Sequence, residues 1–371
     1  MKTIVKLFPV FLVLIALNSC DKRHHEMVTR INPDGSCYRE LTASVDSVFM
    51  VNDTAHHPFP VDLDTNWMVT FTKKTPAGNE TLRKKFSIGK LVDYDTSISR
   101  FVTVHRDYSS VQEMDSLFKF ANCDWSKVVP KSDLQKKFRW FYTYYYYTET
   151  YPKVNPFTRI PITNYVTNEE IQAYTGDNTD LFKGKIGVEV KDILTQIEGK
   201  INAWLNRSTY EEMFNFYLKY YRYLGDMPVD SATFLHLKDS IYKKIEDSTK
   251  YDNAYFASDL FDKYFKTKAY SEAKAPEEIE EKGEKELAGL FTFEDYFKMS
   301  LTNQLLMPGK VLETNTQVMK HDTLSWDLTA YRFFFNDYTL TAKSRLPNTW
   351  AFLLTGFLIL IVFLSFFIKR K

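Results

Sequence analysis

The sequence predicts an α+β protein: a mainly antiparallel sheet built from N- and C-terminal segments, an inserted helical subdomain and one C-terminal transmembrane helix. Three patterns support this fold class. Apolar residues alternate with polar ones through residues 27–165, recur at helical spacing through 166–287, and alternate again through 288–347. Because strands flank a helical segment, we expect one β-rich ectodomain that is completed from both ends of the chain.

Composition argues against three classes of protein. The chain has 371 residues, of which 44% are hydrophobic and 16% aromatic, and this is too apolar for a disordered protein. Its 12 glycines leave little material for glycine-rich phosphate loops. Without the terminal cations Lys2, Lys6, Lys369, Arg370 and Lys371, the 48 basic residues fall to 43 against 47 acidic ones. A mildly acidic body argues against nucleic acid as a partner.

The first residues read as an export signal. Lys2 and Lys6 precede an apolar run, Leu7 to Leu17, which is too short to span a bilayer core of about 30 Å. The run ends in Leu17-Asn18-Ser19-Cys20, which resembles the lipobox of bacterial lipoproteins. We therefore expect a signal peptide at 1–19, an acylated Cys20, and a lipidated tether at 20–26. The alternative is an ordinary signal or an uncleaved anchor with an incidental cysteine.

The last apolar segment has the length of a membrane span. Residues 350–368 carry no charge, and as a helix they would be about 28 Å long. Trp350 marks one interface, and Lys369, Arg370 and Lys371 mark the other. Positive charge stays in the cytoplasm, so we expect a cytoplasmic tail at 369–371 and a body that faces the periplasm or the outer surface. Asp21 after the cysteine resembles a retention signal, so the expected location is the bacterial inner membrane.

The remaining cysteines leave two alternatives open. Cys37 and Cys123 could form a disulfide in an oxidising compartment, or they could be two separate thiols in a core. No His-x-x-x-His or Cys-x-x-Cys spacing occurs, so the sequence indicates no metal site and no cofactor.

A tyrosine-rich segment at 138–151 predicts a strand, because aromatic residues and threonine favour strands. One face would carry Phe138, Trp140, Tyr142, Tyr144 and Tyr146, which we consider as an aromatic binding surface for a sugar or a lipid head group. The alternative is a central strand between packed layers. In the helical segment, Asn206-Arg207-Ser208 predicts a break between two helices. After that segment, we expect Phe291 to Leu306 to be extended.

Several short motifs resemble a known family. They are Ile31-Asn32-Pro33-Asp34-Gly35 after the lipobox, Met307-Pro308-Gly309-Lys310-Val311, Asn315, and Leu324-Ser325-Trp326 before a C-terminal helix. Together they resemble membrane-anchored lipoproteins of the mycobacterial LppM type, over about a third of the chain. The resemblance implies a small α+β fold in an uncharacterised or lipid-binding envelope domain, and it transfers no catalytic residue.

Two functions follow as hypotheses. The first is a non-enzymatic envelope module, anchored through membrane lipid, that binds a lipid ligand or an envelope protein. The second is a periplasmic hydrolase acting on envelope glycan or lipid; the chain lacks a Gly-x-Ser-x-Gly motif. Its candidate acids and bases are Glu149, Glu169, Glu170, Glu211, Glu212, His105 and His321.

Overall fold

The computed structural model describes residues 23–45, 49, 57–89, 91, 97–176, 178–246, 257–273, 275–316 and 318–368. Two compact units make up this part of the chain. We call Lys22–Lys153 with Asp295–Lys371 the sheet unit, and Val154–Glu294 the helical unit. The helical unit is thus inserted in sequence between the two parts of the sheet unit. The predicted α+β class, with inserted helices and an apolar C-terminal helix, is confirmed.

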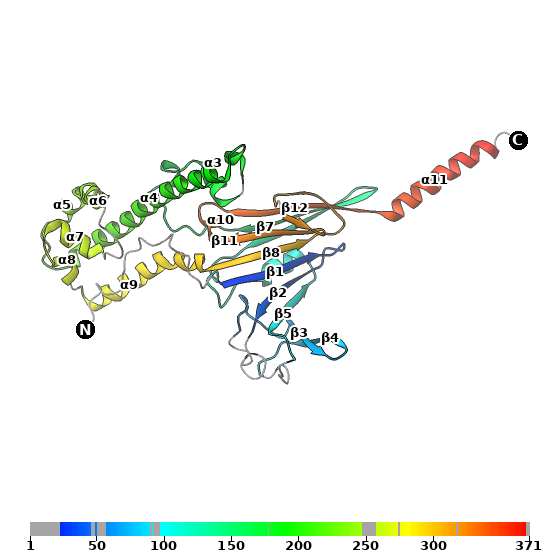
Figure 1. Cartoon of the computed structure of the whole chain (residues 1–371), viewed down its shortest axis with the longest axis horizontal. Coiled ribbons are helices and arrows are strands. Elements are labelled where there is room, and N and C mark those ends of the chain that lie inside the picture. Colours follow the sequence, from blue (N-terminus) through cyan, green and yellow to red (C-terminus); the bar gives the residue numbers. More distant parts are fainter. Residues whose placement is uncertain are drawn as a thin grey trace. The chain divides into compact units, whose positions relative to one another are not determined.

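The larger sheet of the sheet unit joins strands from both ends of the chain (Figure 1). Its order is β10-β11-β8-β1-β2-β5-β3-β4. Strand β1 pairs in parallel with β8, from Arg23 beside Met299 to Arg30 beside Leu306, and the other pairs are antiparallel. The strands are β1 (Arg23–Ile31), β2 (Cys37–Ser44), β3 (Met68–Thr75), β4 (Gly78–Lys85), β5 (Phe101–Tyr108), β8 (Met299–Leu306), β10 (Val318–Lys320) and β11 (Thr323–Thr329).

The smaller sheet has four antiparallel strands in the order β6-β7-β12-β9. They are β6 (Lys131–Phe138), β7 (Tyr142–Tyr151), β12 (Tyr338–Pro347) and β9 (Lys310–Thr314). The tyrosine-rich segment supplies β7, a central strand paired over its whole length with β12. Among the described residues of the sheet unit, α2 (Val111–Leu117) is a short helix that precedes β6, and α10 (Ala330–Phe334) is a short helix that follows β11.

The turn motifs Asn32-Pro33-Asp34-Gly35 and Pro76-Ala77-Gly78-Asn79 predict two hairpins, and both hairpins form. Asn32 to Gly35 closes the β1–β2 hairpin, and the Gly35 amide donates to the Asn32 carbonyl at 3.0 Å. Gly35 has a φ of 101°, a conformation in which a residue without Cβ is favoured. Gly78 closes the β3–β4 hairpin at a φ of 126°. These local signals determine which strands pair with their sequence neighbours.

The two sheets pack face to face, and their core is aromatic. Tyr145, Tyr147 and Tyr151 of β7 are buried between them, and Trp125 packs edge-on against Phe333 with ring centroids 5.0 Å apart. The Asn315 amide oxygen accepts from the Trp326 indole of the larger sheet at 3.1 Å and from the Thr341 amide of the smaller sheet at 2.9 Å. Burying each large apolar side chain contributes about 1.5–3 kcal/mol, so this core is the main stabilising element of the unit.

The helical unit has its own aromatic core. Its buried centre contains Tyr210, Met213, Phe214, Tyr221, Phe234, Ile241, Phe261 and Tyr270. Phe214 and Phe234 stack with ring centroids 4.5 Å apart. The α-helices of this unit are α3 (Asn168–Thr175), α4 (Gly187–Tyr220), α5 (Ser231–His236), α6 (Lys238–Glu246), α7 (Ala257–Phe265), α8 (Ala269–Glu272) and α9 (Glu277–Phe291). Short 3₁₀ turns join them at η2 (Ile162–Asn164), η3 (Asp180–Phe182) and η4 (Tyr221–Tyr223).

Two predictions about these segments are wrong. The break predicted at Asn206-Arg207-Ser208 does not occur, because α4 continues through it for 34 residues. Arg207 there is held on the helix by Glu211, one turn later, at 2.7 Å. The segment predicted as extended from Phe291 starts with η5 (Thr292–Lys298), and strand β8 begins only at Met299. In both places packing decides what weak local signals leave open.

The last helix, α11 (Thr349–Ile368), follows β12 directly (Figure 1). Its segment Thr349–Phe366 has a mean hydropathy of 2.3, and 6% of that segment is buried. Length and composition therefore fit a membrane span. The exposed flank of the helix contains large apolar side chains, including Leu353 at 75% exposure, which is typical of a surface that lipid covers.

Candidate functional site

Strand β7 presents two different faces. Burial alternates along Tyr142–Tyr151, with the odd-numbered residues buried and the even-numbered ones half-buried. The odd-numbered side chains face the larger sheet. Tyr142, Tyr144 and Tyr146 therefore lie together on the outer face, where the sequence placed them.

Basic side chains lie over the rings of the outer tyrosines, so these rings do not form an open stacking surface. The Arg345 guanidinium lies 4.6 Å from the centre of the Tyr142 ring, and the Lys137 ammonium lies 4.9 Å from that of Tyr146. Lys343 lies 5.6 Å from the same Tyr146 ring. Such contacts stabilise each exposed pair by about 0.5–1 kcal/mol and leave the positive charges at the surface.

Trp140 does not belong to that face, and here the predicted strand is corrected. The chain turns at 139–141, so Phe138 ends β6 and β7 starts at Tyr142. The turn is tight, because the amides of Arg139 and Tyr142 each donate to the other residue's carbonyl, at 2.8 and 3.1 Å. Trp140 and Phe141 therefore form the tip of a β6–β7 hairpin.

The tip packs against the start of α11. The Trp140 indole donates to the Thr355 hydroxyl at 2.9 Å, and its ring meets Trp350 edge-on at 5.3 Å. Phe141 lies 4.7 Å from Phe352, and Phe138 stacks parallel to Trp350 at 6.3 Å. We call Phe138, Trp140, Phe141, Trp350 and Phe352 the aromatic tip. Its members are between 38% and 58% exposed, although they contact one another.

Asn348 connects the hairpin to the helix. Its side-chain nitrogen donates to the carbonyls of Arg139 and Trp140, at 2.8 and 3.1 Å, and its side-chain oxygen accepts from the Thr143 hydroxyl at 2.9 Å. Its backbone amide donates to the Phe141 carbonyl at 2.8 Å. One residue at the entry of α11 therefore holds both ends of the turn. Sequence reasoning missed Asn348, and its only local signal was an asparagine before an apolar helix.

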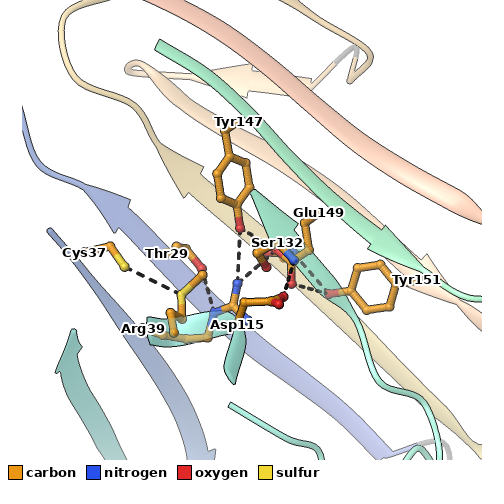
Figure 2. A network of polar contacts seen from close by, with 10 residues as sticks. Thr29, Cys37, Arg39, Asp115, Ser132, Tyr147, Glu149 and Tyr151 are labelled. Carbon is orange, nitrogen blue, oxygen red and sulfur yellow. Dashed lines mark hydrogen bonds and ion pairs between the residues drawn. The ribbon is translucent and has the colours of Figure 1, made fainter. Parts of the chain in front are cut away.

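A buried polar network lies between the two sheets (Figure 2). Arg39 of β2 forms an ion pair of 2.9 Å with Glu149 of β7, and each side chain is 1% exposed. Arg39 also donates to the Thr29 hydroxyl at 3.0 Å, and Glu149 accepts from Tyr147 at 2.8 Å and Tyr151 at 3.2 Å. Asn303 of β8 donates to Glu149 at 3.2 Å.

The charges in this network are mutually compensated. Burial alone would lower the pKa of Arg39, but the Glu149 carboxylate and the neighbouring tyrosines raise it, and the net shift is upward. Burial, together with the Glu149 charge, raises the pKa of Tyr147 well above its usual value. The Glu149 carboxylate is therefore held by its partners inside the core, and the network has a structural role in joining the two sheets.

The other acids and bases considered for hydrolysis are dispersed. Glu170 pairs with Lys200 at 2.6 Å and Glu212 with Arg159 at 3.1 Å, whereas Glu211 pairs with Arg207 and with Lys238. Glu169 is exposed, His105 packs against Tyr38, and His321 lies in an exposed turn. Among the described residues, no three His, Cys, Asp or Glu side chains gather as a metal site would require.

The two cysteines of the body are separate thiols. Cys37 is buried with its sulfur 3.8 Å from that of Met114, and the Cys123 sulfur lies 3.9 Å from the Pro60 carbonyl oxygen. Of the two alternatives, the structure thus contains the thiols and not the disulfide. The predicted lipidation site Cys20 and the interface residues Lys369, Arg370 and Lys371 lie outside the described residues.

Comparisons with known proteins add little. No family model matches the chain, and no curated protein is significantly similar to it in sequence. A search of solved structures finds the NMR structure of the folded domain of the Mycobacterium tuberculosis LppM protein. That match has 8% sequence identity and a TM-score of 0.26, and it covers 88% of this chain and 91% of that one. The predicted resemblance is supported in part, as a weak structural likeness that carries no argument about function.

Proposed function

We propose that this protein is a membrane-anchored extracytoplasmic lipoprotein, a non-enzymatic envelope module that binds lipid or an envelope protein at its membrane-proximal end. The observation that carries the proposal is the hydrogen bond from the Trp140 indole to Thr355 of α11. It ties a hairpin of the folded body to the apolar helix itself.

The position of Thr355 along α11 indicates the depth at which this contact would lie in a bilayer. Thr355 is six residues beyond Thr349, so it lies about 9 Å along the helix at 1.5 Å per residue. When α11 spans a bilayer, the aromatic tip lies at the level of the head groups and the first acyl carbons. Tryptophan and other aromatic rings are enriched at that level, because one end of the ring is apolar and the other can stay hydrated.

The proposal includes two anchors and an orientation. Acylation of Cys20 would attach the start of the body to the leaflet into which α11 inserts, with Lys369, Arg370 and Lys371 in the cytoplasm and the body outside the inner membrane. Two acyl chains already give stable attachment, so the helix mainly limits the reach of the body above the bilayer. The body is thereby kept close to lipid and to membrane-embedded partners.

Hydrolysis receives no support from a specific observation. Glu149 is ion-paired in the core, and Glu170, Glu211 and Glu212 each pair with a cation. A catalytic carboxylate must reach its substrate, and Glu149 at 1% exposure does not. Binding is therefore the function that the geometry favours.

Depth-dependent fluorescence quenching tests the proposal. The full chain is reconstituted into phosphatidylcholine vesicles brominated near the head group or deep in the acyl chain. We expect Trp140→Phe to remove a fraction of the quenching by shallow bromines, because its indole lies at that depth. The matched control is Trp67→Phe, since Trp67 is buried in the sheet unit at 3% exposure. Equal quenching of the Trp140→Phe variant and the wild type would contradict the proposal.

Purification from native membranes tests the rest of it. We expect mass spectrometry to find an acylated Cys20 and co-purifying lipid or envelope protein. Protease added to spheroplasts should digest the body and spare a tag after Lys371. Recovery of neither lipid nor protein, combined with turnover of a cell-wall substrate, would favour the hydrolase instead.

A further inference from the structure

A row of three cations crosses the outer face of the smaller sheet. Lys137 of β6 and Arg345 of β12 are both register partners of Tyr144 on β7, and Lys310 of β9 is the partner of Arg345. Directly opposed residues of antiparallel strands share a face, and Tyr144 lies on the outer one. We call Lys137, Arg345 and Lys310 the basic row.

The basic row lacks neutralising carboxylates. Among the described residues none of its three members forms an ion pair, whereas Lys343, one step further along the outer face, pairs with Glu313 at 2.5 Å. Tyr142 and Tyr146 lie under the charged ends of Arg345 and Lys137 and hold them in place without cancelling their charge. Such uncompensated charge is typical of a surface that meets an anion.

Gly309 places Lys310 in the row. A Cβ at this position would lie 2.3 Å from the carbonyl oxygen of Arg345, and the glycine has a φ of 74°. Only a residue without a side chain permits this approach of β9 to β12. The Ser344 hydroxyl, which donates to the Pro308 carbonyl at 2.8 Å, fixes the same crossing.

The row lies near the membrane end of the sheet. Arg345 precedes Thr349 by four residues, which is at most about 13 Å of extended chain at 3.3 Å per residue. Head groups add about 5–8 Å to each side of a bilayer core. Long basic side chains can bridge the remaining gap, since they keep their charged ends in the polar layer.

We propose that the basic row binds the phosphate of an anionic phospholipid in the bilayer that holds α11. This inference rests on the proposed function and names its ligand class. The match is one of charge: three uncompensated cations, arranged across four strands beside the apolar helix, face a layer of lipid phosphates. Each basic residue near an anionic membrane surface strengthens binding about fivefold.

Native mass spectrometry of the full chain in neutral detergent tests the inference. Phosphatidylglycerol and phosphatidylcholine are titrated separately, and the stoichiometry and affinity of bound lipid are compared. The wild type should prefer phosphatidylglycerol, and Lys137→Gln/Lys310→Gln/Arg345→Gln should weaken that binding on the order of a hundredfold, because three residues that each contribute about fivefold are lost. The matched control Arg83→Gln/Lys85→Gln/Lys127→Gln removes three exposed cations elsewhere in the sheet unit and should retain the preference.

Each outcome decides for or against the row. Equal loss in the two triple variants would show a net-charge effect, and unchanged binding in the row variant would show that the row is not the site; either overturns the inference. Tight binding of inorganic phosphate, lost in the same variant, would also overturn it in favour of a free anion. Arg345→Lys, which keeps the charge, should bind nearly as the wild type does, and a circular dichroism spectrum of the row variant that matches the wild type excludes misfolding as the cause. Vesicle flotation tests anchoring separately, so failure of the proposed function is distinguishable from failure of the row.

Discussion

Arg39 and Glu149 form an ion pair of 2.9 Å between two packed sheets, where neither side chain is more than 1% exposed. The pair joins β2 of the larger sheet to β7 of the smaller one, and six further hydrogen bonds that involve Thr29, Tyr147, Tyr151 and Asn303 complete the network. Desolvation of both charges is costly, so the intact ion pair adds little net stability, whereas loss of one partner leaves an uncompensated charge in the core.

Removing one partner should be severely destabilising. Arg39→Met leaves a buried carboxylate without its cation, and we expect the free energy of unfolding to fall by about 3–5 kcal/mol. Arg39→Met/Glu149→Leu should recover part of that loss, because no charge remains buried, although the tyrosine hydroxyls lose an acceptor. Urea unfolding of the full chain in detergent, followed by near-ultraviolet circular dichroism, measures both. A double variant as unstable as the single one would contradict this account.

Alkaline pH should destabilise the sheet unit. Burial raises the pKa of the Cys37 thiol to about 11 and that of the Tyr108 hydroxyl to about 12. In the unfolded state the thiol has a pKa of about 8.5 and the phenol a pKa of about 10. As the pH rises, the unfolded state therefore releases these protons before the folded state does. The free energy of unfolding is therefore highest below the unfolded-state pKa values, and it falls as the pH rises through about 9 to 12.

The contribution of Cys37 can be isolated. In Cys37→Ala the fall in unfolding free energy between pH 9 and 11 should be shallower, and the fall that remains should come from Tyr108 and the other buried tyrosines. Chemical unfolding at several pH values compares the slopes. Identical slopes in the variant and the wild type would exclude Cys37 as a source.

Asn348 should control the contact between hairpin and helix. Asn348→Ala removes the side-chain bonds to Arg139, Trp140 and Thr143, and retains the backbone bond to Phe141. At about 1 kcal/mol for each lost bond, the tip should loosen and the Trp140 emission should shift to the red. Asn348→Asp keeps the acceptor for Thr143 and should be intermediate. If the three proteins emit alike, Asn348 does not hold the tip.

Two glycines with positive φ should differ in their tolerance of alanine. A Cβ added at Gly35 would meet open space, so Gly35→Ala should cost only the backbone penalty of about 1–2 kcal/mol. Gly309→Ala adds a clash with the Arg345 carbonyl, and overpacking adds about 1–3 kcal/mol. Thermal unfolding of both variants measures the difference. Equal melting temperatures would mean that β9 can shift away from the Arg345 carbonyl without loss of stability.

Local patterns anticipated several parts of the site. Alternation along β7 separated the buried Tyr145 from the outward Tyr144, and the uncharged run at the end of the chain identified α11. Glu149 was different. As a carboxylate in a polar-aromatic segment, it was a reasonable catalytic candidate. Its structural role is visible only in the fold, where it pairs with Arg39 from a strand 110 residues away in the sequence.

The same distinction applies to the whole protein. Its sequence by itself determined the α+β class, the hairpin turns at Gly35 and Gly78, and the apolar helix, since each depends on residues close together in the chain. Tertiary structure alone decided that β1 pairs in parallel with β8, that Trp140 reaches Thr355, and that Lys310 joins Arg345. Periodicity specifies which face a side chain occupies, but the residue it meets there depends on the packing of distant segments.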